Sequence, residues 1–260
     1  HGFGGIEVAN QVMVVTIGVF LLRTESLEGA YEVIRTAEAA DDVRTALVAR
    51  GATIAVLDWR GEWEALERDA SEALELATRM GAARFEAAAV PHLGVAMAAQ
   101  GRVEQARATL RTAYAKGHEA GLAFYGPIIL GVMALVTDEP ERRRELLDEA
   151  QQLLEGGCVS HNYLRFYPYG MYVAWALGDA DRLERYADAL EAYAAAEPLP
   201  WTELFVPWGR TLARALRGEV DAAALRALRE RVAEQELSLA AAPLDVLLGS
   251  AETAPFTRGS

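Results

Sequence analysis

The sequence predicts an all-α fold: a right-handed α-solenoid of about six tetratricopeptide-like helical hairpins. Two phased series of glycines and a composition rich in alanine, leucine, glutamate and arginine predict it. The first series recurs about every 38 residues inside apolar, helix-patterned runs. It consists of Gly18, Gly94, Gly131, Gly170 and Gly209, with Ala55 in the one vacant place. The second series follows a few residues later and opens polar stretches: Gly61, Gly101, Gly178 and Gly218.

Each series has a physical interpretation. A glycine inside a helix costs roughly 1 kcal/mol relative to alanine, so its recurrence indicates that two helices approach closely there. The second series is suited to turning the chain between the two helices of a pair. Paired helices at this period are typical of α-solenoids, which usually bind or scaffold other molecules.

The helical pattern divides the chain into pairs. We expect helices at 7–23 and 26–40, 42–60 and 62–80, 84–100 and 103–119, 124–155 with a turn at 138–140, 162–177 and 181–196, and 202–217 and 221–237. Ser26 is suited to an N-cap, and Pro140 to a first helical turn. A segment at 242–248 is expected to cap the open end. Residues 1–248 would then form one domain, and residues 249–260 a disordered tail.

The third pair carries the most specific repeat pattern. Gly94, Gly101, Ala106 and Ala113 follow the large–small spacing of a tetratricopeptide repeat. The period exceeds the roughly 34 residues usual for that repeat, so the helices are expected to be longer than standard.

Composition limits the partners and the compartment. The formal net charge of −13 argues against an extended nucleic-acid or anionic-membrane footprint. A single cysteine, Cys158, excludes an internal disulfide and fits a reducing cytoplasm. The longest apolar run, 12–22, is too short to span a bilayer. We therefore expect a cytoplasmic protein, and because the chain begins at His1 we expect a fragment of a longer one.

Four features in the second half of the chain form a familiar combination: Cys-Val-Ser-His-Asn at 158–162, the aromatic run at 163–172, Gly178-Asp179, and Glu-Pro-Leu-Pro-Trp at 197–201. Together they resemble the C-terminal helical-repeat region of bacterial multidomain regulatory ATPases, which carry a class III adenylate/guanylate cyclase or a LuxR-type output domain. The resemblance is clearest from 158 to 237 and implies a regulatory scaffold. It does not extend to ATP chemistry, because the chain has no Gly-x-x-x-x-Gly-Lys-Ser/Thr loop.

The residues give little support to catalysis or metal binding. His92, His118 and His161 are scattered along the chain and no two of them have i, i+4 spacing, whereas a metal site needs converging ligands. Cys158 lies near His161 and would suit a Cys/His nucleophile, but no acyl-transfer motif surrounds it. We therefore interpret Cys158 as a packing residue, and expect no enzyme activity, metal or cofactor.

The aromatic residues of the last two pairs suggest a binding surface. The repeat frame places on inner helices the candidate partner-binding residues Arg165, Tyr172, Trp175, Phe205 and Trp208. Inner helices line the concave face of a solenoid, where extended partners usually bind. Two interpretations fit: an apolar groove with an arginine at its edge, or rings that fill the core between hairpins.

Two functions follow from these interpretations. The first is a non-catalytic scaffold whose concave face holds a protein or peptide segment, or its own upstream domains. The alternative is a small-molecule effector sensor with an aromatic pocket between the fifth and sixth hairpins. A buried, ligand-sized cavity would favour the sensor, and an open groove the scaffold.

The first helix is apolar nearly all the way round, and it includes Val14, Ile17 and Leu21. Such a helix needs burial on more than one face. We therefore expect self-association, for example a homodimer, through the first hairpin.

Overall fold

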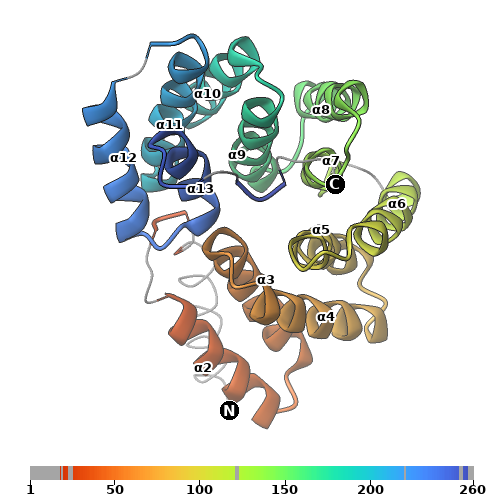
Figure 1. The fold of residues 1–260 in the computed structure, drawn as a ribbon. Helices are drawn as coiled ribbons and strands as arrows, with labels where there is room; N and C mark the ends of the chain where they lie inside the picture. The colour runs from red at the N-terminus through yellow and green to blue at the C-terminus, as the bar shows by residue number, and fades with distance from the viewer. Residues whose placement is uncertain are drawn as a thin grey trace.

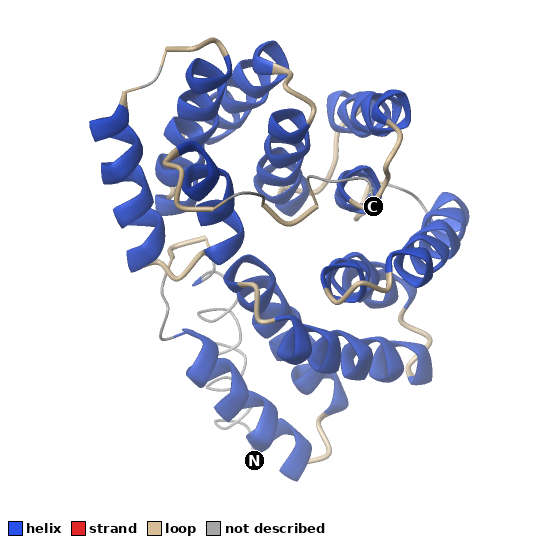
Figure 2. Ribbon diagram, viewed as in Figure 1, coloured by secondary structure: helices blue, strands red, loops and turns tan. Residues whose placement is uncertain are grey.

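The computed structural model describes residues 18, 20–22, 26–120, 123–219, 221–251 and 254–256. Figures 1 and 2 show that these residues form helices and connecting loops, with no strand among them. The helices are α2 (Ser26–Ala39), α3 (Val43–Arg60), α4 (Trp63–Arg79), α5 (Ala83–Ala99), α6 (Val103–Ala120), α7 (Gly126–Leu135), α8 (Pro140–Glu155), α9 (His161–Ala176), α10 (Ala180–Ala194), α11 (Pro200–Leu216), α12 (Ala222–Glu234) and α13 (Ser238–Leu247). The predicted all-α class and its helical hairpins are confirmed.

The helix ends agree with the predicted ranges to within three residues from α2 to α12. Asp42 caps α3 by accepting a hydrogen bond from the Thr45 N–H, and Pro140 opens α8. The expected first helix at 7–23, with the proposed interface residues Val14 and Ile17, lies almost wholly outside the described residues. No helix in the described part of the chain meets the length and apolarity needed to cross a bilayer.

Both glycine series have the structural roles that the sequence predicts. A Cβ placed on Gly94 would lie 2.9 Å from Cγ of Leu110 on α6, so α5 and α6 can approach this closely only with glycine. Gly131, Gly170 and Gly209 also face neighbouring helices closely. The second series adopts left-handed backbone at the helix ends, as at Gly61, whose φ is 74°.

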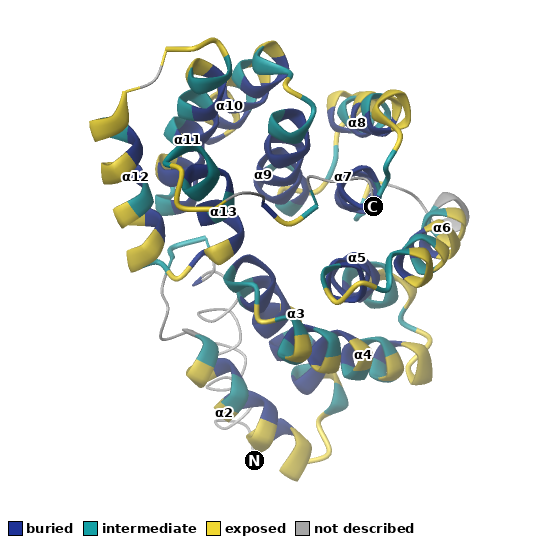
Figure 3. Ribbon diagram, viewed as in Figure 1, coloured by how far each residue is buried: buried dark blue, intermediate teal, exposed yellow. Residues whose placement is uncertain are grey.

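The inner helices close into a ring. Along the chain α3, α5, α7, α9 and α11 contact one another in sequence, and α13 contacts α11, α9 and α3 (Figure 1). The helices α4, α6, α8, α10 and α12 lie outside this ring and carry much of the exposed surface (Figure 3). The segment expected to cap an open end therefore joins the last hairpin back to α3.

Aromatic side chains fill the centre of the ring. The ring of Trp59 lies 4.8 Å from that of Phe205 and 5.8 Å from that of Trp201, while Tyr169 contacts Trp59 from α9 at 5.3 Å. These residues are all buried. Aromatic side chains bury large areas, so this cluster supplies much of the apolar contact that holds α3, α9 and α11 together.

Part of the expected disordered tail is ordered against the ring. Ala254 is buried, and the ring of Phe256 contacts those of Trp63 and Tyr172. The expectation of a fully disordered 249–260 therefore does not hold for residues 254–256.

Candidate effector cavity at Arg165

Two of the four buried arginines have no acidic partner among the described residues. Arg50 and Arg182 each form ion pairs with two carboxylates. Arg143 donates only to main-chain carbonyl groups, and Arg165 donates to neutral side chains. An arginine stays protonated in proteins, and a buried charge is costly unless it is paired. Arg165 and Arg143 are therefore the buried side chains with the strongest physical reason to bind an additional hydrogen-bond acceptor.

A hydrogen-bonded chain of buried side chains fixes Arg165. Its Nη1 lies 3.0 Å from Nε2 of His92 and donates to it, because a guanidinium has no acceptor. His92 must then carry its proton on Nδ1, which lies 2.6 Å from Oδ2 of Asp58. Burial lowers the pKa of His92 and keeps the imidazole neutral.

The other end of this hydrogen-bonded series of side chains is also buried. The hydroxyl of Tyr169 donates to the same Oδ2 of Asp58, and burial raises the pKa of Tyr169 well above its usual value. The chain thus runs from Tyr169 on α9 through Asp58 on α3 and His92 on α5 to Arg165 on α9. Because three inner helices contribute to it, the guanidinium is held in one position before any ligand arrives.

Arg165 lines a partly open cavity of about 200 Å³ between α3, α5 and α9. Small residues on α3, including Gly51, Ala52 and Ala55, leave the space, and Leu47 and Phe85 make its walls apolar. A Cβ built on Gly51 would meet nothing within 4 Å, so this face of α3 is open.

The opposite wall holds Tyr125 and His161. The hydroxyl of Tyr125 lies 3.5 Å from Nη1 of Arg165, and Nε2 of His161 lies 2.6 Å from the carbonyl oxygen of Phe124. His161 therefore donates from Nε2 and leaves Nδ1 as an acceptor. Burial lowers the pKa of His161 to about 4, so its ring is neutral at pH 7.

The side chains that line the cavity include one positive charge, whereas the carboxylate of Asp58 lies behind His92 and does not line it. Arg165 is the one ionised side chain among the described residues of the wall. The guanidinium of Arg84 lies 5.4 Å above the Phe124 ring, which also lines the cavity, so a second positive charge borders it. The arrangement suits an anionic group bound to an apolar body.

The other predicted site residues occupy different positions. Tyr172, Phe205 and Trp208 are fully buried, and Nε1 of Trp208 donates to the Ala240 carbonyl oxygen at 2.9 Å. Trp175 is half-buried beside Tyr172. The expectation of one open inner surface formed by these aromatic side chains is wrong. Because the inner helices close into a ring, the predicted concave face is part of the core. Arg165 alone among the five lines the cavity.

The cleft between the fifth and sixth hairpins has charged side chains in its walls. It lies between α10 and α11, and its walls include Glu184, Glu191, Arg210 and Arg214 but no aromatic residue. Arg210 pairs with Asp188 and Glu191 across it. The aromatic pocket expected at this position is not present among the described residues.

Cys158 and His161 do not form a nucleophilic pair. The Cys158 thiol donates to the Leu153 carbonyl oxygen at 3.3 Å, and burial raises the pKa of that thiol. His161 instead bonds to Phe124. No group of three potential metal ligands converges in the described part of the chain.

Asp58, Tyr125 and Tyr169 are not predicted as site residues from the sequence, and His92 is considered there only as a candidate metal ligand. A usable signal was present, because Asp58 and His92 each interrupt an apolar stretch of an inner helix. Buried polar side chains require partners, so two such interruptions in adjacent hairpins predict a shared hydrogen bond.

Comparisons of the chain with protein-family models, with curated proteins and with solved structures found no match.

Proposed function

We propose that this chain is a non-catalytic regulatory module that senses a small apolar monocarboxylate in the Arg165 cavity. The observation that supports this proposal is the buried, preorganised guanidinium of Arg165, which has no carboxylate partner among the described residues. A bound carboxylate would give Arg165 a direct anionic partner, whereas Asp58 reaches it only through His92. A ligand-sized, partly open cavity with a fixed arginine in its wall favours a sensor.

The geometry defines the carboxylate end of the ligand. Nε and Nη2 of Arg165 have no acceptor among the described residues, so the guanidinium retains donors for a two-pronged contact with a carboxylate. The Tyr125 hydroxyl is positioned to add a hydrogen bond. A dicarboxylate fits poorly, because its second charge would face the apolar wall formed by α3 and α5.

The cavity volume limits the rest of the ligand. A dry protein cavity of about 150 Å³ accommodates benzene, so about 200 Å³ suits roughly eight to ten non-hydrogen atoms. Benzoate, phenylacetate and hexanoate have this size and polarity. Such a ligand would touch α3, α5 and α9 together, and it would shift the ring toward whichever packing binds it more tightly. In a regulatory protein of the kind that the sequence resembles, the change in packing would be the signal.

Calorimetric titration of the chain with benzoate, phenylacetate and hexanoate tests the proposal. Binding should saturate at one site, and benzamide, the neutral counterpart of benzoate, should bind at least tenfold more weakly. Arg165→Met removes the charge while keeping an unbranched side chain, and it should abolish carboxylate binding. Arg210→Met is the matched control on the outer surface and should leave binding unchanged, because Arg210 pairs with Asp188 and Glu191.

Gly51→Leu tests the cavity itself. The new side chain has room to extend from α3 and should block the ligand while leaving the helical circular dichroism signal intact. Absence of saturable binding by all three acids, or equal binding of benzoate by Gly51→Leu, would contradict the proposal.

A further inference from the structure

A segment of the chain is bound at the other end of the inner helices. Residues 254–256 lie beside the C-terminal end of α7 and against Tyr172, about two turns along α9 from Arg165. The contacts come from residues far away in sequence, namely Trp63, Arg143 and Tyr172. We call these three residues the tail seat.

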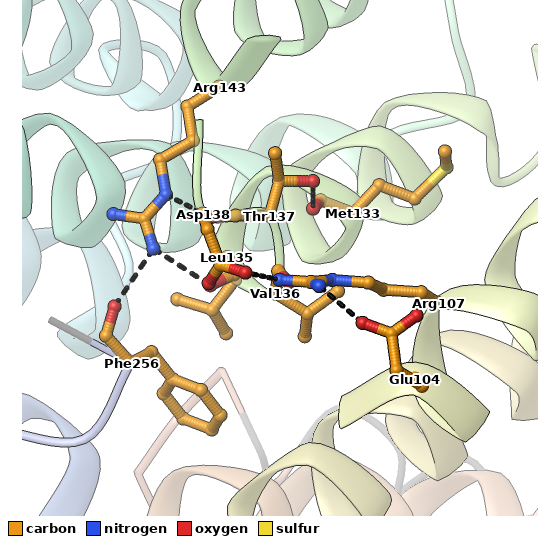
Figure 4. Close-up of polar contacts among 9 residues, drawn as sticks. All are labelled: Glu104, Arg107, Met133, Leu135, Val136, Thr137, Asp138, Arg143 and Phe256. Atoms are coloured by element: carbon orange, nitrogen blue, oxygen red, sulfur yellow. Dashed lines mark hydrogen bonds and ion pairs between the residues drawn. The ribbon is translucent and has the colours of Figure 1, made fainter. Parts of the chain in front are cut away.

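Arg143 is the second buried arginine without an acidic partner among the described residues. Its Nε donates to Thr137 O at 2.5 Å, and its Nη2 donates to Phe256 O at 3.1 Å (Figure 4). The nearby carboxylate of Asp138 pairs instead with Arg107 (Figure 4). Arg143 is 5% exposed, so the carbonyl oxygen of Phe256 is one of the few acceptors it can reach.

Tyr172 binds the preceding residue in the same way. Its hydroxyl donates to Pro255 O at 2.5 Å, from a ring that is fully buried. Two consecutive main-chain carbonyl groups are therefore held by two fixed side chains. Such contacts recognise the backbone of the turn at 255–256 whatever its sequence.

The side chains of the segment add selectivity. The Phe256 ring lies edge-on to Trp63 at 6.3 Å and to Tyr172 at 6.5 Å, an arrangement that favours an aromatic residue at this position. Pro255 has no N–H group that would need a partner, and its fixed φ reduces the entropy lost on docking.

The bound segment is held weakly enough to exchange. Phe256 is only half-buried and has a φ of 59°, in the left-handed region that disfavours residues with a side chain. The entropy lost in ordering three residues is similar in size to the gain from one partly buried ring and two hydrogen bonds. The described residues between Leu247 and Ala254 form no helix, so release breaks no helical hydrogen bond there.

We propose that the tail seat is a peptide-binding site for a partner segment that turns where an aromatic residue follows proline, and that residues 254–256 occupy it in cis. This site is separate from the Arg165 cavity and does not depend on the effector. A tethered segment competes at a high local concentration, so a partner would bind much more tightly when the segment is released.

The test uses a fluorescein-labelled peptide with the sequence of residues 250–260 and the full chain carrying Phe256→Ala, which empties the aromatic position. Fluorescence anisotropy should show binding to this variant at least tenfold tighter than to the wild-type chain. A peptide with alanine in place of its phenylalanine should not bind measurably.

Tyr172→Phe in the Phe256→Ala background isolates the hydrogen bond to the segment. It keeps the buried ring and removes the hydroxyl, and it should weaken peptide binding about fivefold to tenfold, as expected for one lost hydrogen bond. Tyr193→Phe, an exposed residue on α10, is the matched control and should have no effect. Equal affinity of the peptide for wild-type and Phe256→Ala chains, or no effect of Tyr172→Phe, would overturn the proposal. Benzoate titration of Phe256→Ala reports separately on the effector cavity.

Discussion

At the scale of single residues, the buried polar side chains around Arg165 are the most informative about function. His92 and His161 are both neutral, but their hydrogen-bond partners differ. His92 is held between Asp58 and Arg165, and His161 donates to a main-chain carbonyl group. Because both imidazoles are neutral, neither places a second positive charge beside Arg165. Protonation of either ring would place a positive charge next to that guanidinium and weaken the fold.

His161 makes this instability measurable. Its pKa is about 4 in the folded chain and about 6.5 when unfolded, so between these values the unfolded state binds more protons. Stability should therefore fall as the pH is lowered from 6.5 to 4, by about 2 kcal/mol from this residue after allowance for partial exposure. Urea unfolding at pH 7.0 and pH 4.5 should show that His161→Gln, which can still donate to Phe124, loses less stability than the wild type.

The acidic groups provide an internal control for this measurement. Hydrogen bonds lower the pKa of Asp42 and Glu67 below their usual values, so those groups lose stabilising contacts mainly below pH 4 in both proteins. An identical loss of stability in wild type and His161→Gln between pH 7.0 and pH 4.5 would rule out the assigned role of His161.

At the scale of helices, the sequence was a good guide because local patterns determine local structure. Turns at Gly61 and Gly101 require a backbone that glycine adopts easily, and both appear where the second glycine series predicts them. Helix α13 was predicted less well, because it begins at Ser238 rather than near 242. Its position depends on contacts with α12 and α3, which no local pattern indicates. The contacts of residues 254–256 likewise depend on partners far away in the chain.

The helix contacts at the glycines can be tested by a pair of substitutions. Gly94→Leu places side-chain atoms where Leu110 already lies, so it should destabilise the chain by about 1–3 kcal/mol. Gly51→Ala is the control, since its Cβ meets nothing, and it should be stabilising by about 0.5–1 kcal/mol. Both values come from urea titration followed by circular dichroism, and a neutral Gly94→Leu would mean that α5 and α6 do not pack as described.

At the scale of the whole molecule, the closure of the inner helices into a ring decides which predicted side-chain positions are right. The curvature of a solenoid results from small rotations between successive repeats, and no local pattern encodes their sum. The contact of α13 with α3 therefore could not be predicted, and neither could the burial of Tyr172, Phe205 and Trp208 that follows from it. Arg165 was predicted at the edge of an apolar groove on the last two hairpins, but it lines a different cavity, and its partners come from α5 and α3, two and three hairpins earlier in the chain.

Trp208→Ala tests whether the ring acts as one cooperative unit. Trp208 is fully buried, contacts Phe205 at 5.6 Å, and donates to Ala240 on α13, so its loss should destabilise the chain by about 3–5 kcal/mol. Because α13 joins α11 to α3, hydrogen-exchange protection should fall in α3 as well as in α13. Trp175→Ala, at a half-buried position on α9, is the control and should have a smaller effect confined to its own hairpin. In an open solenoid, loss of Trp208 would leave α3 protected, and that result would show that the contact between α13 and α3 does not stabilise the fold.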